Sequence, residues 1–300
     1  MNTPSLTSGR ILVTGASGEL GKLTLHHLLH TIKVNPKQIV AGTRSPHKLQ
    51  IFADVGVQTC FVDFSDLSSV TVAAQGIERA LVISSRDFDQ GESHKAVIRT
   101  LMDTGVQHIV YTSAQAVSVS NSMIAGGHRA TEICLEESKI PGYTILRNGM
   151  YFENCFAALK NASKSGNWLT CAKDGKLSCI ARDDAARAAA YALALDTKGR
   201  HTLEITGPEA LSVDEIVSQI SNVIGKPLQV LQVSELVLAT AIAETLNAPA
   251  VIGQLCASLD KTTAEGYGDF VSDDYKKLTG VEPKKHADWA MANRLVLADL

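Results

Sequence analysis

Three glycines that follow the first apolar run of the chain have the spacing of a phosphate-binding turn. Gly15, Gly18 and Gly21 come directly after residues 10–14 (RILVT) and open a segment with helical periodicity at 19–31. In a strand–turn–helix unit, Gly15 permits a tight turn, Gly18 lets backbone N–H groups approach a pyrophosphate, and Gly21 lets the helix pack closely on the strand. The positive end of the helix dipole then attracts the phosphates. This context predicts a dinucleotide-binding turn; the alternative is a tight turn without a ligand.

A nucleotide-hydrolysing loop is the main competing interpretation, and the sequence argues against it. Such a loop needs G-x-x-x-x-G-K-[ST]. If Gly21 and Lys22 ended the motif, its first glycine would fall at Ala16, and Leu23 would replace the hydroxyl that binds Mg²⁺. We therefore expect dinucleotide binding without nucleotide hydrolysis.

The end of the second predicted strand, residues 38–43, indicates which dinucleotide binds. An NAD site places Asp or Glu there to bond the ribose 2′-OH, whereas this strand is followed by Arg44 and Ser45. The planar cation of Arg44 suits a 2′-phosphate, and Lys48 adds a charge one helical turn further on. These residues favour NADP(H) over NAD(H). The alternative is that Arg44 is a solvated loop residue.

Short β-branched runs alternate with helical patterns through the first half of the chain. The predicted strands are 10–14, 38–43, 58–62, 80–83, 107–112 and 143–146, and the predicted helices are 19–31, 46–55, 93–104 and 126–138. This alternation predicts βαβ units with right-handed crossovers. The expected fold class is therefore α/β, a doubly wound parallel (Rossmann) sheet with its ligand at the carboxyl ends of the strands.

The pattern changes after residue 150. Helices are predicted at 151–165, 183–195 and 212–224, the last opened by a capping box, and a strand is predicted at 201–206. We expect residues 1–150 to form the NADP-binding domain, with about 178–206 packing back on it. Residues 151–177 and 207–300 would form a smaller, mostly helical, substrate-binding lobe.

Composition narrows the functional classes. The 300 residues carry 28 Lys and Arg against 31 Asp and Glu, a formal charge of −3, which argues against a general nucleic-acid binder. The apolar stretch 185–195 is far shorter than the ~20 residues of a transmembrane helix. The six cysteines are dispersed and form no C-x-x-C pair, so we expect reduced, mostly buried thiols. His26 and His30 lie one helical turn apart but lack a third ligand, so we expect no metal site. A cytoplasmic protein without a membrane or nucleic-acid partner is expected.

Six segments together resemble the NmrA-like group of atypical short-chain dehydrogenases/reductases. They are TGASGELG (14–21), GTRSP (42–46), DFSD (63–66), LVISS (81–85), LRNGMYFEN (146–154) and TGPEALS (206–212). The similarity extends over most of the chain and is greatest to the NADPH-dependent quinone oxidoreductases and triphenylmethane dye reductases of that group. The resemblance implies a Rossmann fold that binds NADP(H).

The resemblance also implies roles for individual residues. The residues that would hold the phosphates are Gly15, Ala16, Ser17, Gly18, Glu19, Leu20 and Arg44. Asp63 and Phe64 would flank the adenine, and the ribose and nicotinamide would be bordered by Ser84, Ser85 and Arg86. The nicotinamide end and the substrate cleft would be lined by Asn148, Gly149, Tyr151 and Glu153.

One departure from conventional short-chain dehydrogenases bears on the chemistry. Those enzymes use a Tyr with a Lys four residues later, and none of the six tyrosines here has such a Lys. Reduction of a simple ketone creates a basic alkoxide that needs a proton donor. A quinone instead gives a phenolate-like anion with a pKa of about 10, which water can protonate, and a cationic dye carbon needs no proton. The missing pair therefore favours a quinone or a similar conjugated acceptor.

His128 is the candidate for a catalytic side chain. It precedes Glu132 by four residues on one helical face, and a Lys occupies the equivalent position in some NmrA-like members. We expect His128 to titrate near neutrality and to hydrogen-bond a quinone oxygen while Glu132 orients its ring; an ordinary surface pair is the alternative. We interpret Trp168 and Trp289 as packing residues and Asp183–Asp184 as helix caps.

The sequence thus predicts an NADPH-dependent reductase that transfers hydride to a small quinone-like acceptor without a metal or a flavin. Two alternatives remain open. One is an NADP(H)-binding redox-sensing regulator that acts through a protein partner, and the other is a reductase of an activated ketone, alkene or imine. A homodimer is also compatible with the sequence.

Overall fold

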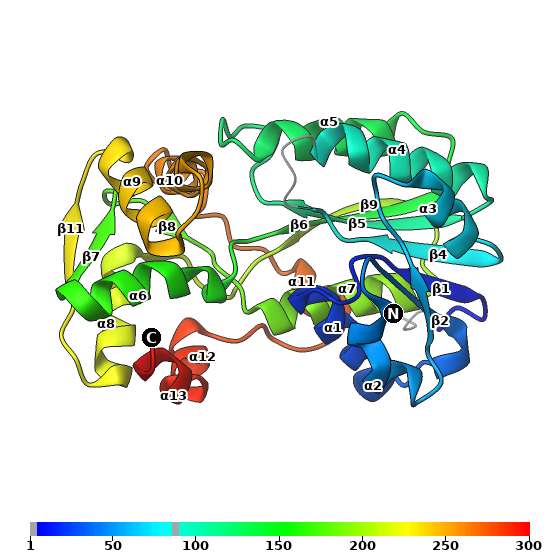
Figure 1. The fold of residues 1–300 in the computed structure, drawn as a ribbon, viewed down its shortest axis with the longest axis horizontal. Coiled ribbons are helices and arrows are strands. Elements are labelled where there is room, and N and C mark those ends of the chain that lie inside the picture. The colour runs from blue at the N-terminus through cyan, green and yellow to red at the C-terminus, as the bar shows by residue number, and fades with distance from the viewer. Residues whose placement is uncertain (1–4, 86–89) are drawn as a thin grey trace.

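Seven parallel strands form the central sheet of the computed structural model, which describes residues 5–85 and 90–300 (Figure 1). The strands are β1 (Arg10–Val13), β2 (Ile39–Thr43), β3 (Gln58–Phe61), β4 (Ile77–Val82), β5 (His108–Ala114), β6 (Gly142–Asn148) and β9 (Arg200–Ile205). Their order is β3-β2-β1-β4-β5-β6-β9, and every neighbouring pair is parallel. The order reverses between β1 and β4, so the predicted doubly wound α/β fold is confirmed.

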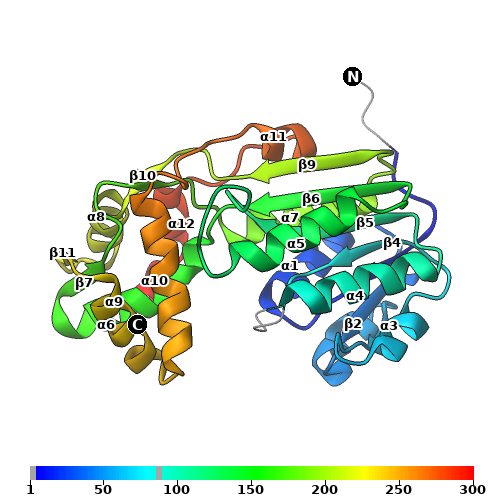
Figure 2. The same cartoon turned by 90° about the horizontal axis from the view of Figure 1, so that it is seen from above.

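Helices cover both faces of the sheet, which explains why its central strands are apolar along their length. On one face lie α3 (Leu67–Ala73), α4 (Gln90–Asp103) and α5 (Ala125–Glu136), and on the other lie α1 (Glu19–His26) and α7 (Arg182–Ala194) (Figures 1 and 2). Alternate residues of a strand therefore enter different cores. Ile11 packs in the core of α1 and α7, whereas Leu12 packs with Val70 of α3 and Val97 of α4.

Three predicted helices are divided, and one helix was not predicted. The predicted helix 151–165 is the 3₁₀ turn η4 (Phe152–Cys155) followed by α6 (Phe156–Ser165). The predicted helix 19–31 is α1 followed by the π-helical η1 (His27–Thr31), and 46–55 is the 3₁₀ turn η3 (Pro46–Leu49) followed by α2 (Gln50–Ala53). A further 3₁₀ turn, η2 (Pro36–Gln38), precedes β2. The unpredicted helix α3 begins at an Asp66 side-chain cap, a local signal that its short length concealed.

The alanines of α7 let this helix pack closely on the sheet. Seven of them are at most 1% exposed, namely Ala185, Ala186, Ala188, Ala189, Ala190, Ala192 and Ala194. Arg79 of β4 reaches the end of the helix and donates to the carbonyls of Ala192 and Leu193 at 3.0 and 2.8 Å. These otherwise unpaired carbonyls are therefore capped by a side chain from the sheet.

The remaining elements form a separate group beyond the carboxyl ends of the strands (Figure 2). They are η4 (Phe152–Cys155), α6 (Phe156–Ser165), β7 (Asn167–Thr170), β8 (Lys176–Leu177), β10 (Leu211–Ser212), α8 (Val213–Ile224), β11 (Gln229–Gln232), α9 (Glu235–Leu246), α10 (Ala250–Ala264), α12 (His286–Ala292) and α13 (Arg294–Ala298). Trp168 and Trp289 are buried in the core of this group, so their interpretation as packing residues is confirmed. That this group is a substrate-binding lobe stays a prediction.

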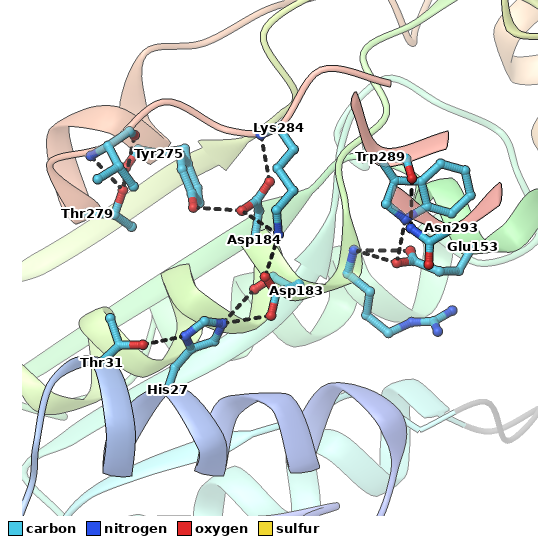
Figure 3. Close-up of polar contacts among 12 residues, drawn as sticks. His27, Thr31, Glu153, Asp183, Asp184, Tyr275, Thr279, Lys284, Trp289 and Asn293 are labelled. Atoms are coloured by element: carbon cyan, nitrogen blue, oxygen red, sulfur yellow. Dashed lines mark hydrogen bonds and ion pairs between the residues drawn. The ribbon is translucent and has the colours of Figure 1, made fainter. Parts of the chain in front are cut away.

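A set of polar contacts fastens the C-terminal segment to the sheet domain (Figure 3). Asp183 accepts from His27 of η1 at 2.9 Å and from the Lys284 ammonium at 2.6 Å. Asp184 accepts from the Tyr275 hydroxyl of α11 (Asp274–Thr279) at 3.0 Å and from the Lys284 N–H at 2.7 Å. Both carboxylates lie in the first turn of α7, as expected, but they bind distant residues, so their interpretation as caps is wrong.

The cysteines are less buried than predicted. All six are free thiols, but only Cys179 is buried, and the other five are partly exposed. Four of these five, Cys60, Cys134, Cys155 and Cys171, pack at the borders of the hydrophobic cores without being enclosed by them, so the expectation of mostly buried thiols is wrong.

Candidate functional site

The turn between β1 and α1 has the geometry that its glycines predicted. Gly15 adopts a positive φ of 60°, and the Gly18 N–H donates to the Gly15 carbonyl at 3.0 Å. A Cβ on Gly21 would lie 2.4 Å from the Gly15 oxygen, so only glycine lets the first turn of α1 pack against the loop. The Ala16 N–H donates to the carbonyl of Gly42 at 3.0 Å, which fixes the turn to β2.

The N-terminus of α1 has free N–H groups to offer. Its N-cap residue, Gly18, contributes no side-chain hydrogen bond to the first turn. Unbonded N–H groups and the helix dipole together attract an anion. Ser17 contacts Thr43 of β2 with 2.5 Å between the hydroxyl oxygens. The side chain of Leu20 packs in the core and that of Glu19 is exposed, so these two residues offer a ligand mainly their backbone.

Positive charge without an ion-pair partner stands at the end of β2. Arg44 and Lys48 are both exposed, and neither makes an ion pair within residues 5–85 and 90–300. Asp63, at the end of β3, accepts from the N–H and the hydroxyl of Ser65 at 3.0 and 2.8 Å. These bonds, with a smaller effect of nearby Arg44, hold the pKa of Asp63 below its ordinary value.

The segment after β4 is fastened to the helix layer. The Ser84 N–H donates to a threonine hydroxyl of β5 at 2.9 Å, and the Ser85 N–H donates to Nε2 of His94 at 2.9 Å. The ring of Phe64, which follows β3, meets the same His94 ring edge-on with 6.1 Å between centroids. Arg86, also predicted to border the nicotinamide, lies outside the described residues.

The end of β6 presents a buried polar atom that lacks a partner. Asn148 donates from Nδ2 to the Tyr151 hydroxyl at 3.1 Å, whereas its Oδ1 is buried and has no hydrogen-bond partner among the residues that the structure describes. A Cβ on Gly149 would lie 2.6 Å from the carbonyl oxygen of Ser178, so a glycine is required there. A buried acceptor without a donor is suited to an N–H group of a ligand.

Glu153, the last predicted site residue of this segment, has structural partners. It accepts from the Arg182 N–H at 3.1 Å and from the Trp289 indole N–H at 3.2 Å, which joins η4, α7 and α12 (Figure 3). These bonds explain why an acidic residue follows Phe152 here. A contribution of Glu153 to a cofactor site stays a prediction.

His128 lies near the start of α5 and is only 6% exposed. Its Nδ1 lies 2.7 Å from the Tyr111 hydroxyl oxygen. Glu132 instead accepts from the Ser113 hydroxyl at 2.6 Å and from Arg147 at 2.7 Å, so it does not orient the His128 ring as predicted. Burial lowers the pKa of His128 to about 4, so the expected titration near neutrality is also wrong. This face of α5 is turned into the core, where a neutral imidazole is favoured.

Two groups of interacting polar residues, buried or partly buried, were missed from the sequence. One is the ion-paired set Glu132, Arg147 and Glu204, in which Arg147 also contacts Glu204 at 3.2 Å. The other is His94 and Tyr111, whose contact is 3.2 Å. A signal for His94 was present, because it occupies the same helical stripe as apolar residues three, four and seven positions later.

A cavity of about 590 Å³ lies where the loop after β5 meets α9 and α10. Its lining includes Met123, Leu236 and Lys261, and none of the predicted cofactor residues borders it. The loop is fixed to α10 by the Ser120–Thr262 hydroxyl contact at 3.1 Å. No sequence motif predicted this cavity, because residues 121–123 of the loop lie more than one hundred positions before the residues of α9 and α10 that form the rest of its wall.

Within residues 5–85 and 90–300, no helix combines the length and apolar character that crossing a membrane requires. The same residues include no cluster of three or more His, Cys, Asp or Glu side chains arranged to hold a metal ion.

Comparisons with known proteins agree with this geometry. The model of the NmrA-like family matches residues 7–289. Quinone oxidoreductase 2 of Escherichia coli (strain K12) is 33% identical over 270 residues, which cover 90% of this chain and 92% of that protein. An NADPH-dependent quinone oxidoreductase of Escherichia coli in complex with NADPH has a TM-score of 0.87 at 31% identity, covering 94% of this chain and 99% of the other. Triphenylmethane reductase of Citrobacter sp. in complex with NADP(H) has a TM-score of 0.85 at 28% identity, covering 95% and 99%.

Proposed function

Because this chain belongs to the NmrA-like family, as its motifs predicted, we propose that it is an NADPH-dependent reductase that transfers hydride to a quinone or a similar flat conjugated acceptor. Relatives over nearly the whole chain include a quinone oxidoreductase and a dye reductase, whose structures hold NADPH and NADP(H). Both kinds of acceptor are planar and conjugated. We infer that the present chain acts on acceptors of the same class.

The uncapped N-terminus of α1 is the observation that carries the proposal. Its free N–H groups stand beside a turn in which Gly21 leaves no room for a Cβ, and this combination suits a pyrophosphate. Arg44 then offers a bidentate cation to a ribose 2′-phosphate, and no carboxylate follows β2 to bond a ribose hydroxyl instead. The unpartnered Oδ1 of Asn148 suits the carboxamide N–H of a nicotinamide. The residues present therefore fit NADPH.

The chemistry divides between cofactor and protein. NADPH, when bound, supplies the hydride. The chain holds the cofactor through the glycine turn and Arg44, and its side chains orient the acceptor. A quinone leaves as a phenolate-like anion that accepts its proton from water, so the chain does not need the Tyr–Lys pair that it lacks. His128, neutral at pH 7, contributes a hydrogen bond to the acceptor oxygen rather than a proton.

Steady-state oxidation of NADPH with a panel of acceptors tests the proposal. The panel contains simple quinones, a cationic triarylmethane dye, and activated ketones, alkenes and imines, each assayed with NADPH and with NADH. We expect turnover of quinones with a preference for NADPH. Turnover restricted to ketones, alkenes or imines would replace the acceptor class. Tight NADPH binding without turnover of any acceptor would overturn the proposal in favour of an NADP(H)-binding regulator.

A further inference from the structure

Three buried aromatic side chains from three different elements meet between the sheet and its helices. His94 of α4 and Tyr111 of β5 are fully buried, and His128 of α5 is 6% exposed. The Tyr111 oxygen lies 3.2 Å from Nδ1 of His94 and 2.7 Å from Nδ1 of His128. One tyrosine hydroxyl therefore links the two imidazoles.

The helices approach closely enough for this contact because of two glycines. A Cβ on Gly91 of α4 would lie 3.1 Å from the Cα of Gly127 of α5, so the helices nearly touch there. His94 and His128 follow these glycines on their helices, and their ring centroids are 6.5 Å apart. The close approach of α4 and α5 at these glycines brings both rings against Tyr111.

The hydrogen bonds have one consistent direction. The Ser85 backbone N–H can only donate, so Nε2 of His94 is the acceptor of the 2.9 Å bond between them. A neutral His94 then carries its proton on Nδ1 and donates it to the Tyr111 oxygen. Tyr111 in turn donates its own proton to Nδ1 of His128 at 2.7 Å. The proton of a neutral His128 must therefore be on Nε2.

The two histidines are neutral at physiological pH. Burial lowers the pKa of His94 and of His128 to about 4 and raises the pKa of Tyr111 above its ordinary value. The charged group that acts on His128 is Glu132 of α5, which favours protonation but is already engaged by Arg147. His94 and Tyr111 are the titratable groups that face His128 from α4 and β5.

This chain of bonds cannot conduct a proton, because it begins at a backbone amide that does not release one. The effect of these bonds is instead to fix the orientation of the His128 ring. Among the described residues none accepts a hydrogen bond from Nε2 of His128. This nitrogen is also not fully enclosed, unlike the buried Oδ1 of Asn148. The Nε2–H is therefore open to a ligand.

We propose that His94 and Tyr111 are positioning residues that fix His128 in the Nε2–H tautomer, which makes it a neutral hydrogen-bond donor to the oxygen of the acceptor. The hydrogen bond from Ser85 also connects this donor to the segment after β4, which is predicted to border the nicotinamide. One hydrogen-bond network therefore holds both the donor and that segment. The hydrogen bond from His128 to the acceptor rests on the proposed function, whereas the assignment of the two tautomers does not.

Long-range ¹H–¹⁵N NMR of the histidine rings tests the tautomers without any turnover. The variants His94→Gln and His128→Gln assign the signals. Between pH 6 and 8 we expect His94 to be protonated at Nδ1 and His128 at Nε2, with no titration of either ring. A proton on Nε2 of His94, or titration of His128 near pH 6.5, would overturn the inference.

Kinetics of matched variants test the effect on the acceptor. Tyr111→Phe removes the linking hydroxyl, and we expect kcat with a quinone to fall about three- to tenfold while KM for NADPH is unchanged. Tyr143→Phe is the control, because Tyr143 is buried on the neighbouring strand in the same core and its hydroxyl has no hydrogen bond among the described residues. Equal kcat values for these two variants would contradict a positioning role.

Conservative replacement of His94 separates positioning from packing. In His94→Gln, the amide oxygen can accept from Ser85 while its N–H donates to Tyr111, so we expect kcat within about twofold of wild type. His94→Leu retains bulk but no polarity, and kcat should fall as in Tyr111→Phe. Similar losses in both variants would indicate packing alone. Absence of wild-type turnover would overturn the proposed function, and the NMR tautomers would still decide the network by themselves.

Discussion

Arg44 is the side chain on which the cofactor preference depends. It is exposed after β2 and has no ion-pair partner among the described residues, so its guanidinium is available for a 2′-phosphate. Arg44→Ala should weaken NADPH binding by about 1–3 kcal/mol, the scale of a charged hydrogen-bond partner, and leave NADH binding almost unchanged. Isothermal titration calorimetry with both cofactors measures this difference.

Arg99→Ala is the control for that measurement. Arg99 is exposed on α4, so the variant changes the net charge equally without touching the end of β2. It should bind both cofactors as wild type does. Equal losses of NADPH and NADH affinity in Arg44→Ala would show that Arg44 does not recognise the 2′-phosphate.

At the scale of elements, the contact between α1 and its turn predicts opposite effects for two glycine substitutions. In Gly21→Ala the new methyl group would lie 2.4 Å from the Gly15 oxygen, so α1 must shift, at a cost of about 1–3 kcal/mol and with loss of NADPH affinity. In Gly126→Ala nothing lies within 4 Å, and helix propensity should raise the free energy of unfolding by about 0.5–1 kcal/mol. Urea unfolding of both variants checks the contrast, and a neutral Gly21→Ala would refute the packing argument.

The elements that the sequence predicted well are those specified by local pattern. The glycine turn, the apolar strands and the capping box at Ser212 each depend on neighbours within a few residues. The contact of His94 with Tyr111 and His128 was not predictable in this way, because it depends on the approach of α4 to α5. For the same reason the prediction from helical spacing that Glu132 pairs with His128 was wrong. In the folded chain Glu132 forms its ion pair with Arg147 of β6.

For the whole molecule, Asp184 holds the C-terminal segment against α7. Its two carboxylate oxygens accept from the Tyr275 hydroxyl and from the Lys284 N–H, whereas an asparagine has one accepting oxygen and places an NH₂ donor at the other position. Asp184→Asn should therefore lower the free energy of unfolding by about 1–3 kcal/mol and speed hydrogen exchange in residues 281–300. Asp103→Asn, at an exposed position at the end of α4, is the control and should change neither. Unchanged exchange in Asp184→Asn would mean that other contacts hold the segment.

Buried neutral histidines make the stability of the whole molecule depend on pH. Burial lowers the pKa to about 4 for His94, His128 and His286 and to about 3 for His108. The unfolded chain, with histidine pKa values of about 6.5, binds more protons below that pH, so the free energy of unfolding should fall as pH drops from about 6.5 toward 4. At pH 5 each such histidine contributes up to about 2 kcal/mol of this loss.

One substitution tests the origin of that dependence. His286 donates from Nδ1 to Gln219 at 2.6 Å, a bond that the amide N–H of His286→Asn can replace. Urea unfolding between pH 8 and 5 should therefore show a shallower decline for His286→Asn than for wild type, whereas His47→Asn at an exposed site should follow wild type. Identical declines in all three proteins would rule out buried His286 as a source.

Hydride transfer from NADPH to a quinone is the reaction that we propose for this protein, and a single-turnover experiment observes it without the complication of product release. Enzyme saturated with one equivalent of NADPH is mixed with excess simple benzoquinone in a stopped-flow spectrometer, and the loss of NADPH absorbance and the yield of hydroquinone are followed. We expect one hydroquinone per NADPH, formed at a rate that saturates with quinone and exceeds the rate of the same mixture without enzyme. Bound NADPH that persists unchanged, or decays only at the rate seen without enzyme, would rule out hydride transfer to a quinone by this protein.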